Sequence, residues 1–362
     1  MKAAILEKGG TPLTIADVSL APIGPREVRV RTAAAGLCHT DLHCMEGNLA
    51  LPLPIVLGHE AAGIVEAVGR DVTRFRPGEH VVGCLSVYCG TCEHCLSGDM
   101  AQCANPATKI PPGVAKRLNR DGKYLTQGFN LGAFAEEMLV HENAIVKIRK
   151  DMPLDLAALV GCAVLTGTGS VIRTAKVPPG ATVVVIGCGG VGLSAIMGAK
   201  LCGALRIIAI DLLPSKLALA TELGATDVVN AVETDPVEAV LEMTGGGVNF
   251  VFECIGNKRA VEQGFHMLAS GGALTLMGSM PDGVDVSFPG REIFRRQRRI
   301  LGSLMGSNRF PVDIPRLVEF YMQGRLPLDK LVSRRIGLNE INDGFRALSE
   351  GAVTRSVITF DL

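Results

Sequence analysis

Residues 182–192 read TVVVIGCGGVG and decide the fold of the second half of this chain. The first five residues are a continuous run rich in β-branched side chains, which predicts a buried strand. The glycines that follow have the spacing G-x-G-x-x-G, which permits a tight turn, close approach of the backbone to a pyrophosphate and close packing of helix on strand. The N-terminus of that helix offers unpaired N–H groups to phosphate. The stretch therefore predicts a strand, a phosphate-binding turn and a helix.

A carboxylate stands where a dinucleotide-binding domain needs one. Asp211 ends the next apolar run, at a distance from the glycines where it can hydrogen-bond the hydroxyls of an adenosine ribose. The glycine pattern is weak evidence for dinucleotide binding by itself, and its position after a strand, together with Asp211, makes that evidence strong. Leu212 and Leu213 follow in place of an arginine, so a 2′-phosphate would meet a negative charge. The sequence therefore predicts NAD rather than NADP.

The same pattern extends over the chain after residue 151. Apolar strands alternate with helix-length segments, among them 191–201, 215–223 and 258–268. Continuous β-branched runs with helical crossovers predict a parallel sheet covered on both faces, and six strands fit a doubly wound dinucleotide-binding fold. We expect the strands at 182–186, 206–210, 227–230, 250–253, 273–276 and 299–301.

The first 150 residues have a different pattern. Residues 27–31 alternate charged and apolar side chains, and 63–69 and 80–83 are short runs bounded by glycine. Such runs, divided by frequent Gly and Pro, predict a compact, partly antiparallel barrel or sandwich. The fold class is therefore α/β with a β-rich first domain. After Gly302 we expect helices at 314–322 and 341–348, and a strand at 356–360 that returns to the first domain.

Length and composition exclude several classes of function. The 362 residues suggest about two domains, and Lys+Arg balance Asp+Glu at 36 each. This balance favours neither nucleic acid nor a membrane surface as a partner, so we expect a small-molecule ligand. No run approaches ~20 uninterrupted apolar residues, and the N-terminus has no leader pattern. The protein is expected to be soluble and cytoplasmic.

Four cysteines form the strongest metal signal. Cys89, Cys92 and Cys95 have the spacing C-x-x-C-x-x-C, and Cys103 follows after a short intervening segment. Four thiolates can wrap one tetrahedral zinc and leave no open position, so this zinc would be structural. Disulfides and an iron–sulfur cluster are the alternatives. In a long chain without a leader, cysteine-rich loops favour metal over disulfides.

Two short turns carry a second set of ligands. Residues 36–43 read GLCHTDLH and residues 58–60 read GHE, so Cys38 and His59 each follow an apolar run. Cys162 is the best candidate for a third ligand, because it lies just before the dinucleotide domain. Two thiolates and an imidazole would leave one tetrahedral position free for water or a substrate oxygen, as in a catalytic zinc site. Spacing alone does not fix this pairing.

These elements together resemble the zinc-dependent medium-chain alcohol dehydrogenases over nearly the whole chain. The resemblance implies a GroES-like catalytic domain, residues 1–163 completed by 306–362, and a Rossmann NAD-binding domain, residues 164–305. It also implies a homodimer or homotetramer. The matching elements are Gly36-Leu37-Cys38-His39-Thr40-Asp41, Gly58-His59-Glu60, the four-cysteine loop, Gly161-Cys162 with Thr166-Gly167, the glycine motif with Asp211, and Arg355.

The resemblance also implies roles for single residues, several of which would otherwise pass as ordinary turn or surface positions. Thr40 takes the alcohol proton, His43 passes it toward solvent, and Glu60 is the acidic neighbour of the zinc. The catalytic zinc ligands are Cys38, His59 and Cys162, and the structural ones Cys89, Cys92, Cys95 and Cys103. The cofactor contacts are His39 and Arg355 at the pyrophosphate, Lys216 near the adenosine ribose, and Thr166, Gly187, Gly189, Gly190, Val191, Gly192 and Asp211.

The predicted function is reversible oxidation of primary or secondary alcohols, aromatic or medium-chain ones included, to aldehydes or ketones with NAD and two zinc ions per chain. Polyol or threonine dehydrogenases and glutathione-dependent formaldehyde dehydrogenase are alternatives in the same superfamily. A zinc-free quinone reductase would leave the metal-ligand cysteines unexplained. A non-enzymatic zinc module would leave Asp211 and the glycine motif without a function. Residues 104–131 form a long segment that borders the substrate channel in relatives, so the sequence does not predict the alcohol's shape or the oligomeric state.

Overall fold

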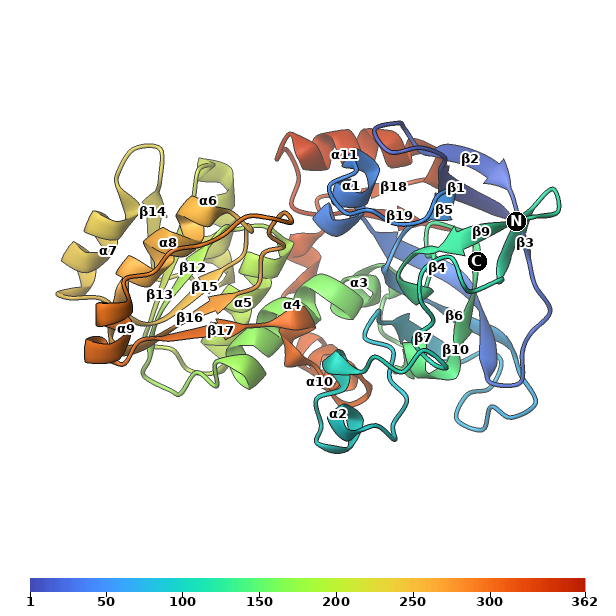
Figure 1. Ribbon diagram of the computed structural model, residues 1–362, viewed down its shortest axis with the longest axis horizontal. Helices are drawn as coiled ribbons and strands as arrows, with labels where there is room; N and C mark the ends of the chain where they lie inside the picture. Colours follow the sequence, from blue (N-terminus) through green and yellow to red (C-terminus); the bar gives the residue numbers. More distant parts are fainter. Residues whose placement is uncertain (362) are drawn as a thin grey trace. The chain divides into compact units, whose positions relative to one another are not determined.

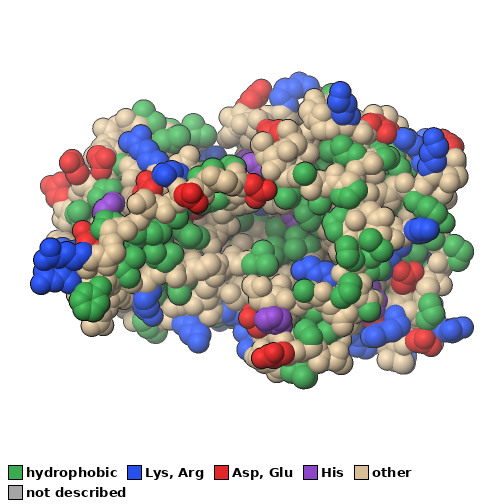
Figure 2. All heavy atoms as spheres, viewed as in Figure 1, with side chains coloured by type: hydrophobic (Ala, Val, Ile, Leu, Met, Phe, Trp, Pro, Cys, Tyr) green, Lys and Arg blue, Asp and Glu red, His purple; other side chains and the backbone are tan. Residues whose placement is uncertain are grey.

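The computed structural model describes residues 1–361, and they divide into two compact units (Figure 1). The first unit comprises Met1–Cys162 and the chain from Arg309 onward, and the second is Ala163–Asn308. The boundaries expected from the sequence are residues 163 and 306. On the face that Figure 2 shows, acidic and basic side chains are interspersed, as the balanced charge predicts.

The second unit contains a six-stranded parallel sheet, which confirms the predicted doubly wound fold. Its strand order is β14-β13-β12-β15-β16-β17, so the order reverses between β12 and β15. This is the 3-2-1-4-5-6 order of dinucleotide-binding domains. The strands are β12 (Thr182–Ile186), β13 (Arg206–Asp211), β14 (Asp227–Asn230), β15 (Val248–Glu253), β16 (Leu268–Leu276) and β17 (Arg299–Gly302).

Helices complete this unit, and apolar side chains of α8 are buried against the sheet. Val184 and Val251 on the strands and Val261 and Phe265 on α8 belong to one buried apolar cluster. Asp235 starts α7 by accepting N–H groups of the first turn, with Pro236 in the first helical position. The helices are α5 (Gly190–Leu201), α6 (Pro214–Leu223), α7 (Pro236–Thr244), α8 (Lys258–His266) and α9 (Gly290–Arg296).

The first unit is β-rich, as predicted, and contains two sheets. The larger has the order β11-β7-β6-β4-β19-β18, with β10 on β4. Its strands are β4 (Glu27–Gly36), β6 (Glu60–Val68), β7 (His80–Gly83), β10 (Glu137–His141), β11 (Ile145–Lys147), β18 (Arg334–Ile336) and β19 (Ser356–Thr359). The second sheet has the order β2-β1-β5-β9-β8-β3, formed by Thr14–Asp17, Lys2–Leu6, Ile55–Val56, Lys123–Gln127, Leu118–Arg120 and Ser19–Leu20.

The C-terminal segment completes the first unit. β19 pairs antiparallel with β4, Val357 opposite Gly36, so the predicted return of the last strand is confirmed. Besides α3 (Leu154–Leu159), which is described below, the α-helices of this unit are α1 (His39–Glu46), α2 (Glu93–Leu96), α10 (Phe310–Met322) and α11 (Ile341–Ser349).

One long helical run, Leu154–Thr174, links the end of the first unit to the start of the second. It consists of α3 (Leu154–Leu159), a π-helical turn at Val160–Val164, α4 (Leu165–Gly169) and a second π-helical turn at Ser170–Thr174. The run is long and apolar enough to cross a membrane, but 83% of its apolar window is buried inside the protein. It is therefore packed as a core helix.

Candidate functional site

The register of β4 with β6 brings Cys38 and His59 together. Gly36, near the end of β4, lies opposite Glu60, the first residue of β6. Cys38 therefore leaves β4 beside the point where His59 enters β6. Cys162 arrives on the π-helical turn, where Gly161 packs against the backbone of Gly83 so closely that a Cβ would collide with its carbonyl oxygen. The ligand atoms of Cys38, His59 and Cys162 all lie within 4.8 Å of one another, and all three residues are buried.

His59 is oriented by a buried carboxylate. Its Nδ1 atom lies 3.2 Å from Oδ1 of Asp41, which also accepts the backbone N–H of Gly58 at 3.0 Å. Its Nε2 atom is buried and has no hydrogen-bond partner among residues 1–361. A proton on Nδ1, donated to Asp41, leaves the Nε2 lone pair free to bind a metal. The donor set therefore fits a zinc ion.

Asp41 is a candidate functional residue that the sequence pattern does not single out. It lies within the motif at 36–43, where no spacing rule assigns it a role. A weak signal was available, because Asp41 lies three residues after Cys38 in the first turn of α1. Its partner His59 is 18 residues away in the chain, so only the tertiary structure shows the contact.

The surroundings of the two cysteines favour the thiolate at Cys38 and the thiol at Cys162. A hydrogen bond from the Cys162 thiol holds the pKa of Cys38 well below its ordinary value, and the charge of Arg355 adds to this effect. The same bond, together with burial, raises the pKa of Cys162. Metal binding would require both cysteines to be deprotonated, because the thiolate is the form that binds a metal.

Glu60 and Arg355 lie behind this set of ligands. Arg355 Nε is 3.8 Å from Glu60 Oε2, and Arg355 Nη1 donates to the carbonyl of Leu37 at 3.0 Å. Both side chains are almost completely buried. Arg355 thus ties the C-terminal segment to the turn that carries Cys38, and its predicted contact with the pyrophosphate stays a prediction.

The predicted relay residues lie on α1. Thr40 Oγ1 is 3.7 Å from Cys38 Sγ, and His43 follows three residues later on the same side of the helix. The His43 side chain is 36% exposed, and its Nδ1 atom lies 3.7 Å from Glu46 Oε2. Thr40 is therefore beside a ligand and His43 reaches solvent. His39 is the first residue of the helix.

An aromatic ring lies against the zinc-ligand candidate His59. The ring of Phe129 meets the imidazole edge-on, with the centroids 4.8 Å apart. Phe129 and Asn130 both have left-handed backbone, with φ of 54° and 62°, and Asn130 Oδ1 accepts the N–H of Ile110 at 2.9 Å. This contact comes from the segment 104–131. No spacing rule in the sequence predicts the role of Phe129.

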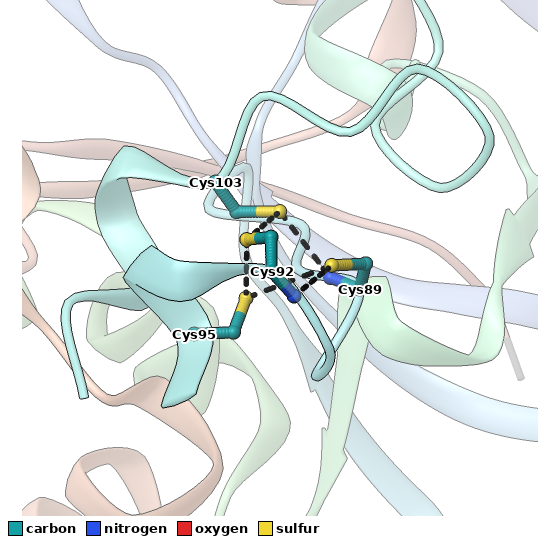
Figure 3. A group of neighbouring side chains, drawn as sticks. All are labelled: Cys89, Cys92, Cys95 and Cys103. Carbon is teal, nitrogen blue, oxygen red and sulfur yellow. Dashed lines mark hydrogen bonds between the residues drawn. The ribbon is translucent and has the colours of Figure 1, made fainter. Parts of the chain in front are cut away.

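The four-cysteine loop forms a closed thiol cluster (Figure 3). Cys92 Sγ lies 3.5 Å from Cys95 Sγ and 3.8 Å from Cys103 Sγ, and Cys89 Sγ lies 3.9 Å from Cys95 Sγ. Sulfurs around a tetrahedral zinc, with bonds of ~2.3 Å, are about 3.8 Å apart. A disulfide needs ~2.05 Å, and all four cysteines are free. The N–H of Thr91 is the main cause that lowers the pKa of Cys89 to about 5.

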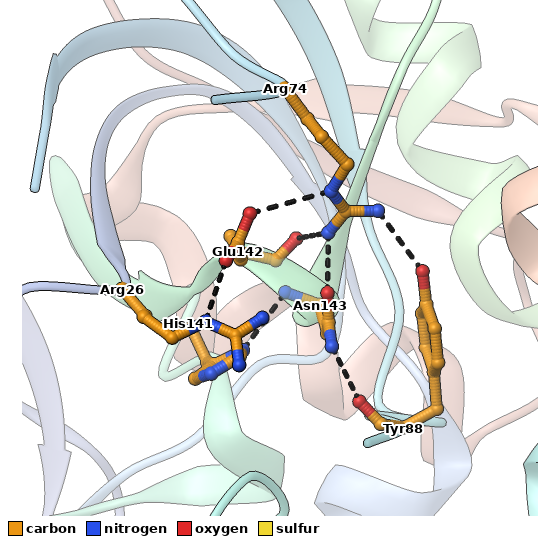
Figure 4. Close-up of polar contacts among 6 residues, drawn as sticks. All are labelled: Arg26, Arg74, Tyr88, His141, Glu142 and Asn143. Carbon is orange, nitrogen blue, oxygen red and sulfur yellow. Dashed lines mark hydrogen bonds and ion pairs between the residues drawn. The ribbon is translucent and has the colours of Figure 1, made fainter. Parts of the chain in front are cut away.

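A partly buried polar network holds the start of this loop (Figure 4). The Arg74 guanidinium donates to the hydroxyl of Tyr88, to Glu142 and to Asn143. Asn143 in turn donates to the carbonyl of Tyr88 at 2.8 Å. Because Tyr88 directly precedes Cys89, the network positions the first ligand of the structural cluster.

The glycine motif has the geometry of a phosphate-binding turn. Gly187 has φ of 92°, and a Cβ on Gly192 would collide with the Gly187 carbonyl. Asp211 lies beside this turn, where its Oδ2 accepts the N–H of Cys188 at 2.7 Å and its Oδ1 accepts that of Leu212 at 2.8 Å. In the same region α5 begins at Gly190, followed by Val191, while Lys216 lies in the first turn of α6 and Thr166 lies on α4.

Comparisons with known proteins agree with this architecture. A model of the alcohol dehydrogenase GroES-like domain matches residues 24–150, and a model of the zinc-binding dehydrogenases matches residues 190–321. The chain is similar to an alcohol dehydrogenase zinc-binding domain protein from Burkholderia ambifaria, with 36% identity over 100% of this chain and 99% of that one and a TM-score of 0.95.

Two further solved structures are similar over 99% of both chains. Benzyl alcohol dehydrogenase from Acinetobacter calcoaceticus has 36% identity and a TM-score of 0.93. A zinc-binding dehydrogenase from Sinorhizobium meliloti, bound to NADP, has 29% identity and a TM-score of 0.83.

Proposed function

The chain belongs to the zinc-dependent medium-chain alcohol dehydrogenases, oxidoreductases that act on alcohols with a nicotinamide cofactor, and we propose that it oxidises primary or secondary alcohols reversibly with NAD. Aromatic primary alcohols are the substrate class that we favour. The observation that carries the proposal is the buried convergence of the Cys38, His59 and Cys162 ligand atoms within 4.8 Å, where Nε2 of His59 has no hydrogen-bond partner among residues 1–361.

Two thiolates and one imidazole suit a catalytic zinc, because they leave one tetrahedral position free. When bound there, zinc supplies Lewis acidity that lowers the pKa of an alcohol hydroxyl. Cys89, Cys92, Cys95 and Cys103 offer four thiolates and would hold a second, structural zinc. We therefore propose two zinc ions per chain.

The chain's own side chains orient the site and move the proton. Asp41 fixes the ring and tautomer of His59. Thr40 accepts the proton that leaves the alcohol, because its hydroxyl lies beside Cys38, and His43 passes that proton to solvent from the exposed side of α1. Glu60, beside the buried Arg355 cation, supplies negative charge behind the ligands.

Phe129 supports the choice of an aromatic substrate. Its ring packs on His59 and presents an apolar surface next to the ligands, where an aromatic ring can pack edge-on or offset. Benzyl alcohol dehydrogenase from A. calcoaceticus, which is 36% identical, is named for such a substrate.

Asp211 supports NAD over NADP. Its carboxylate lies at the end of β13, beside the glycine motif, and the exposed Leu212 and Leu213 follow it. A ribose with free hydroxyls can donate to this carboxylate, whereas a 2′-phosphate would be repelled.

We also propose that the protein forms homodimers or homotetramers. β17 is the last strand of its sheet, with β16 as its neighbour within the described chain. Ile300 on β17 and Phe294 on α9 are exposed, Phe294 by 83%. An edge strand flanked by exposed apolar side chains is a surface that a second copy can cover. Cytoplasmic localisation stays a prediction.

A panel of alcohols tests the proposed function. We expect NADH to form with benzyl alcohol faster than with propan-2-ol, glycerol or threonine, and much faster than NADPH forms with NADP. A requirement for glutathione would indicate the formaldehyde dehydrogenase instead, and a preference for glycerol or threonine would indicate the polyol or threonine enzymes. NAD reduction with none of these alcohols would contradict the proposal.

A further inference from the structure

The segment after β17 has an unusual backbone. Met305, Gly306 and Ser307 are three consecutive residues with left-handed φ, at 50°, 70° and 46°. Such conformations cost about 1 kcal/mol or more for each residue that has a Cβ, and they persist only where the surroundings enforce them. A Cβ on Gly306 would lie 2.5 Å from the carbonyl oxygen of Leu165, so only glycine fits there.

Four hydroxyls enforce this conformation. Ser303 Oγ lies 2.8 Å from Ser170 Oγ and 2.8 Å from Thr174 Oγ1, and Thr174 Oγ1 lies 2.8 Å from Ser307 Oγ. Ser170 and Thr174 belong to the π-helical turn, while Ser303 precedes the left-handed residues and Ser307 is the last of them. The chain of hydroxyls therefore clamps the segment to the helix at both ends. It lies entirely within the second unit.

Counting protons fixes the direction of the chain. Ser170 Oγ donates to the carbonyl of Thr166 at 2.7 Å, and each hydroxyl has a single proton. Ser170 must therefore accept from Ser303, Ser303 from Thr174, and Thr174 from Ser307. Four protons serve four hydrogen bonds, and the network is satisfied in one direction only.

The segment lies at the edge of the sheet where dinucleotides bind. Ser303 follows the carboxyl end of β17, just as Gly187 follows β12 and Asp211 ends β13. In a doubly wound sheet the two halves of a dinucleotide lie over the two halves of the sheet, across the point where the strand order reverses. Asp211 assigns the adenosine half to the side of β13. The nicotinamide half then lies over the carboxyl ends of β15, β16 and β17.

We propose that the Ser307–Thr174–Ser303–Ser170 hydroxyl chain holds the backbone of residues 303–307 in position for the nicotinamide half of the cofactor. This inference rests on the proposed function, because it assumes a nicotinamide dinucleotide. Thr174 is the positioning residue at the centre of the chain: it joins Ser303 to Ser307 and itself contacts neither metal ligand nor glycine motif. Without its hydroxyl, Ser303 loses its donor and Ser307 loses its acceptor.

Comparing two ligands isolates this role from a general loss of stability. NADH has both halves of the dinucleotide, whereas ADP-ribose lacks the nicotinamide ring. Thr174→Val removes the hydroxyl at nearly constant volume, and Thr174→Ser keeps the hydroxyl as the matched control. Ser307→Ala removes only the half-buried end of the chain and is a milder second variant.

Calorimetric titration of the zinc-loaded proteins gives the dissociation constants. We expect Thr174→Val to weaken the binding of NADH about tenfold, which is the effect of one or two lost hydrogen bonds. Ser307→Ala should weaken NADH binding less. Thr174→Ser should bind NADH within about twofold of the wild type, and ADP-ribose should bind all variants alike. Equal weakening of both ligands by Thr174→Val, or no weakening of either, would overturn the inference. A wild type that binds neither ligand would instead contradict the proposed function and the inference with it.

Discussion

Oδ1 of Asp41 accepts two hydrogen bonds, one from the backbone N–H of Gly58 at 3.0 Å and one from Nδ1 of His59 at 3.2 Å. The carboxylate thus fixes both the turn that carries His59 and the direction in which its ring points. Since the His59 and Asp41 side chains are essentially buried, solvent cannot replace this contact. The proposed zinc binding at Nε2 should therefore depend on a residue that is not itself a ligand.

Asp41→Asn tests this dependence. The amide keeps an oxygen acceptor for Gly58 but removes the negative charge that stabilises the tautomer with a proton on Nδ1. We expect zinc affinity at the Cys38 site to fall about 10–100-fold, the usual effect of removing such an orienting group. Titration with a chelator, followed by zinc analysis, measures the affinity. Unchanged affinity would show that Asp41 serves only the turn.

Removing one structural ligand should separate the two metal sites. Cys103→Ser leaves three thiols in the cluster of Figure 3, so we expect one zinc per chain instead of two and a lower melting temperature. Ligand binding at the glycine motif should persist. Cys202→Ser, outside both sets of metal ligands, is the control. A variant that keeps two zinc ions would contradict the assignment of the four cysteines.

The cofactor preference should depend on Asp211. Asp211→Gly removes the carboxylate beside the glycine motif, and we expect the ratio of kcat/KM for NAD to that for NADP to fall at least about tenfold. The ratio of the two kcat/KM values is the useful readout, because loss of the hydrogen bond to Cys188 would weaken the binding of both cofactors together. Leu212→Arg, which adds a cation for a 2′-phosphate, should shift the ratio in the same direction. An unchanged ratio in both variants would refute the argument for NAD.

His141 should make the stability depend on pH. Burial is the main cause that lowers its pKa from 6.5 to about 4, and the charge of Arg26 adds to this effect. Its Nδ1 atom accepts the N–H of Asn143 at 3.0 Å, which requires the unprotonated form. The unfolded chain therefore binds more protons between pH 6.5 and 4, so stability is present above pH 6.5 and falls as the pH drops through this window.

His141→Asn keeps an acceptor for Asn143 without a titrating ring. From pH 7 to pH 5 we expect the wild type to lose about 1–2 kcal/mol more unfolding free energy than the variant. Chemical denaturation at both pH values measures the difference, and His266→Asn at an exposed site is the control. Parallel losses in wild type and variant would show that His141 does not contribute.

The sequence predicted the secondary-structure elements that a local residue pattern specifies. Val183, Val184 and Val185 lie in a β-branched run, and all three are fully buried in the structure. The strands of the second unit could therefore be predicted from such runs in the sequence. Two ligand-rich turns suggested pairing Cys38 with His59 and the family resemblance supported it, and the register of Gly36 with Glu60 supplies the physical reason that the two lie together.

Other parts of the site depend on contacts between distant segments. Asp41 has a role only because His59 enters β6 beside it, and Phe129 reaches His59 through left-handed backbone that an ordinary residue rarely adopts. The hydroxyl chain joins Thr174 to Ser303, 129 residues apart. No periodicity or spacing rule relates such residues, so tertiary structure was needed to find them.

Zinc content and NAD reduction of Cys162→Ser test the central claim most directly. Cys162 is the ligand contributed by the π-helical turn, and the four-cysteine cluster does not include it. We expect the wild type to hold two zinc ions per chain and to reduce NAD with benzyl alcohol, and the variant to keep one zinc ion and lose nearly all of this activity. A variant that keeps two zinc ions and full activity would contradict a catalytic zinc held by Cys38, His59 and Cys162.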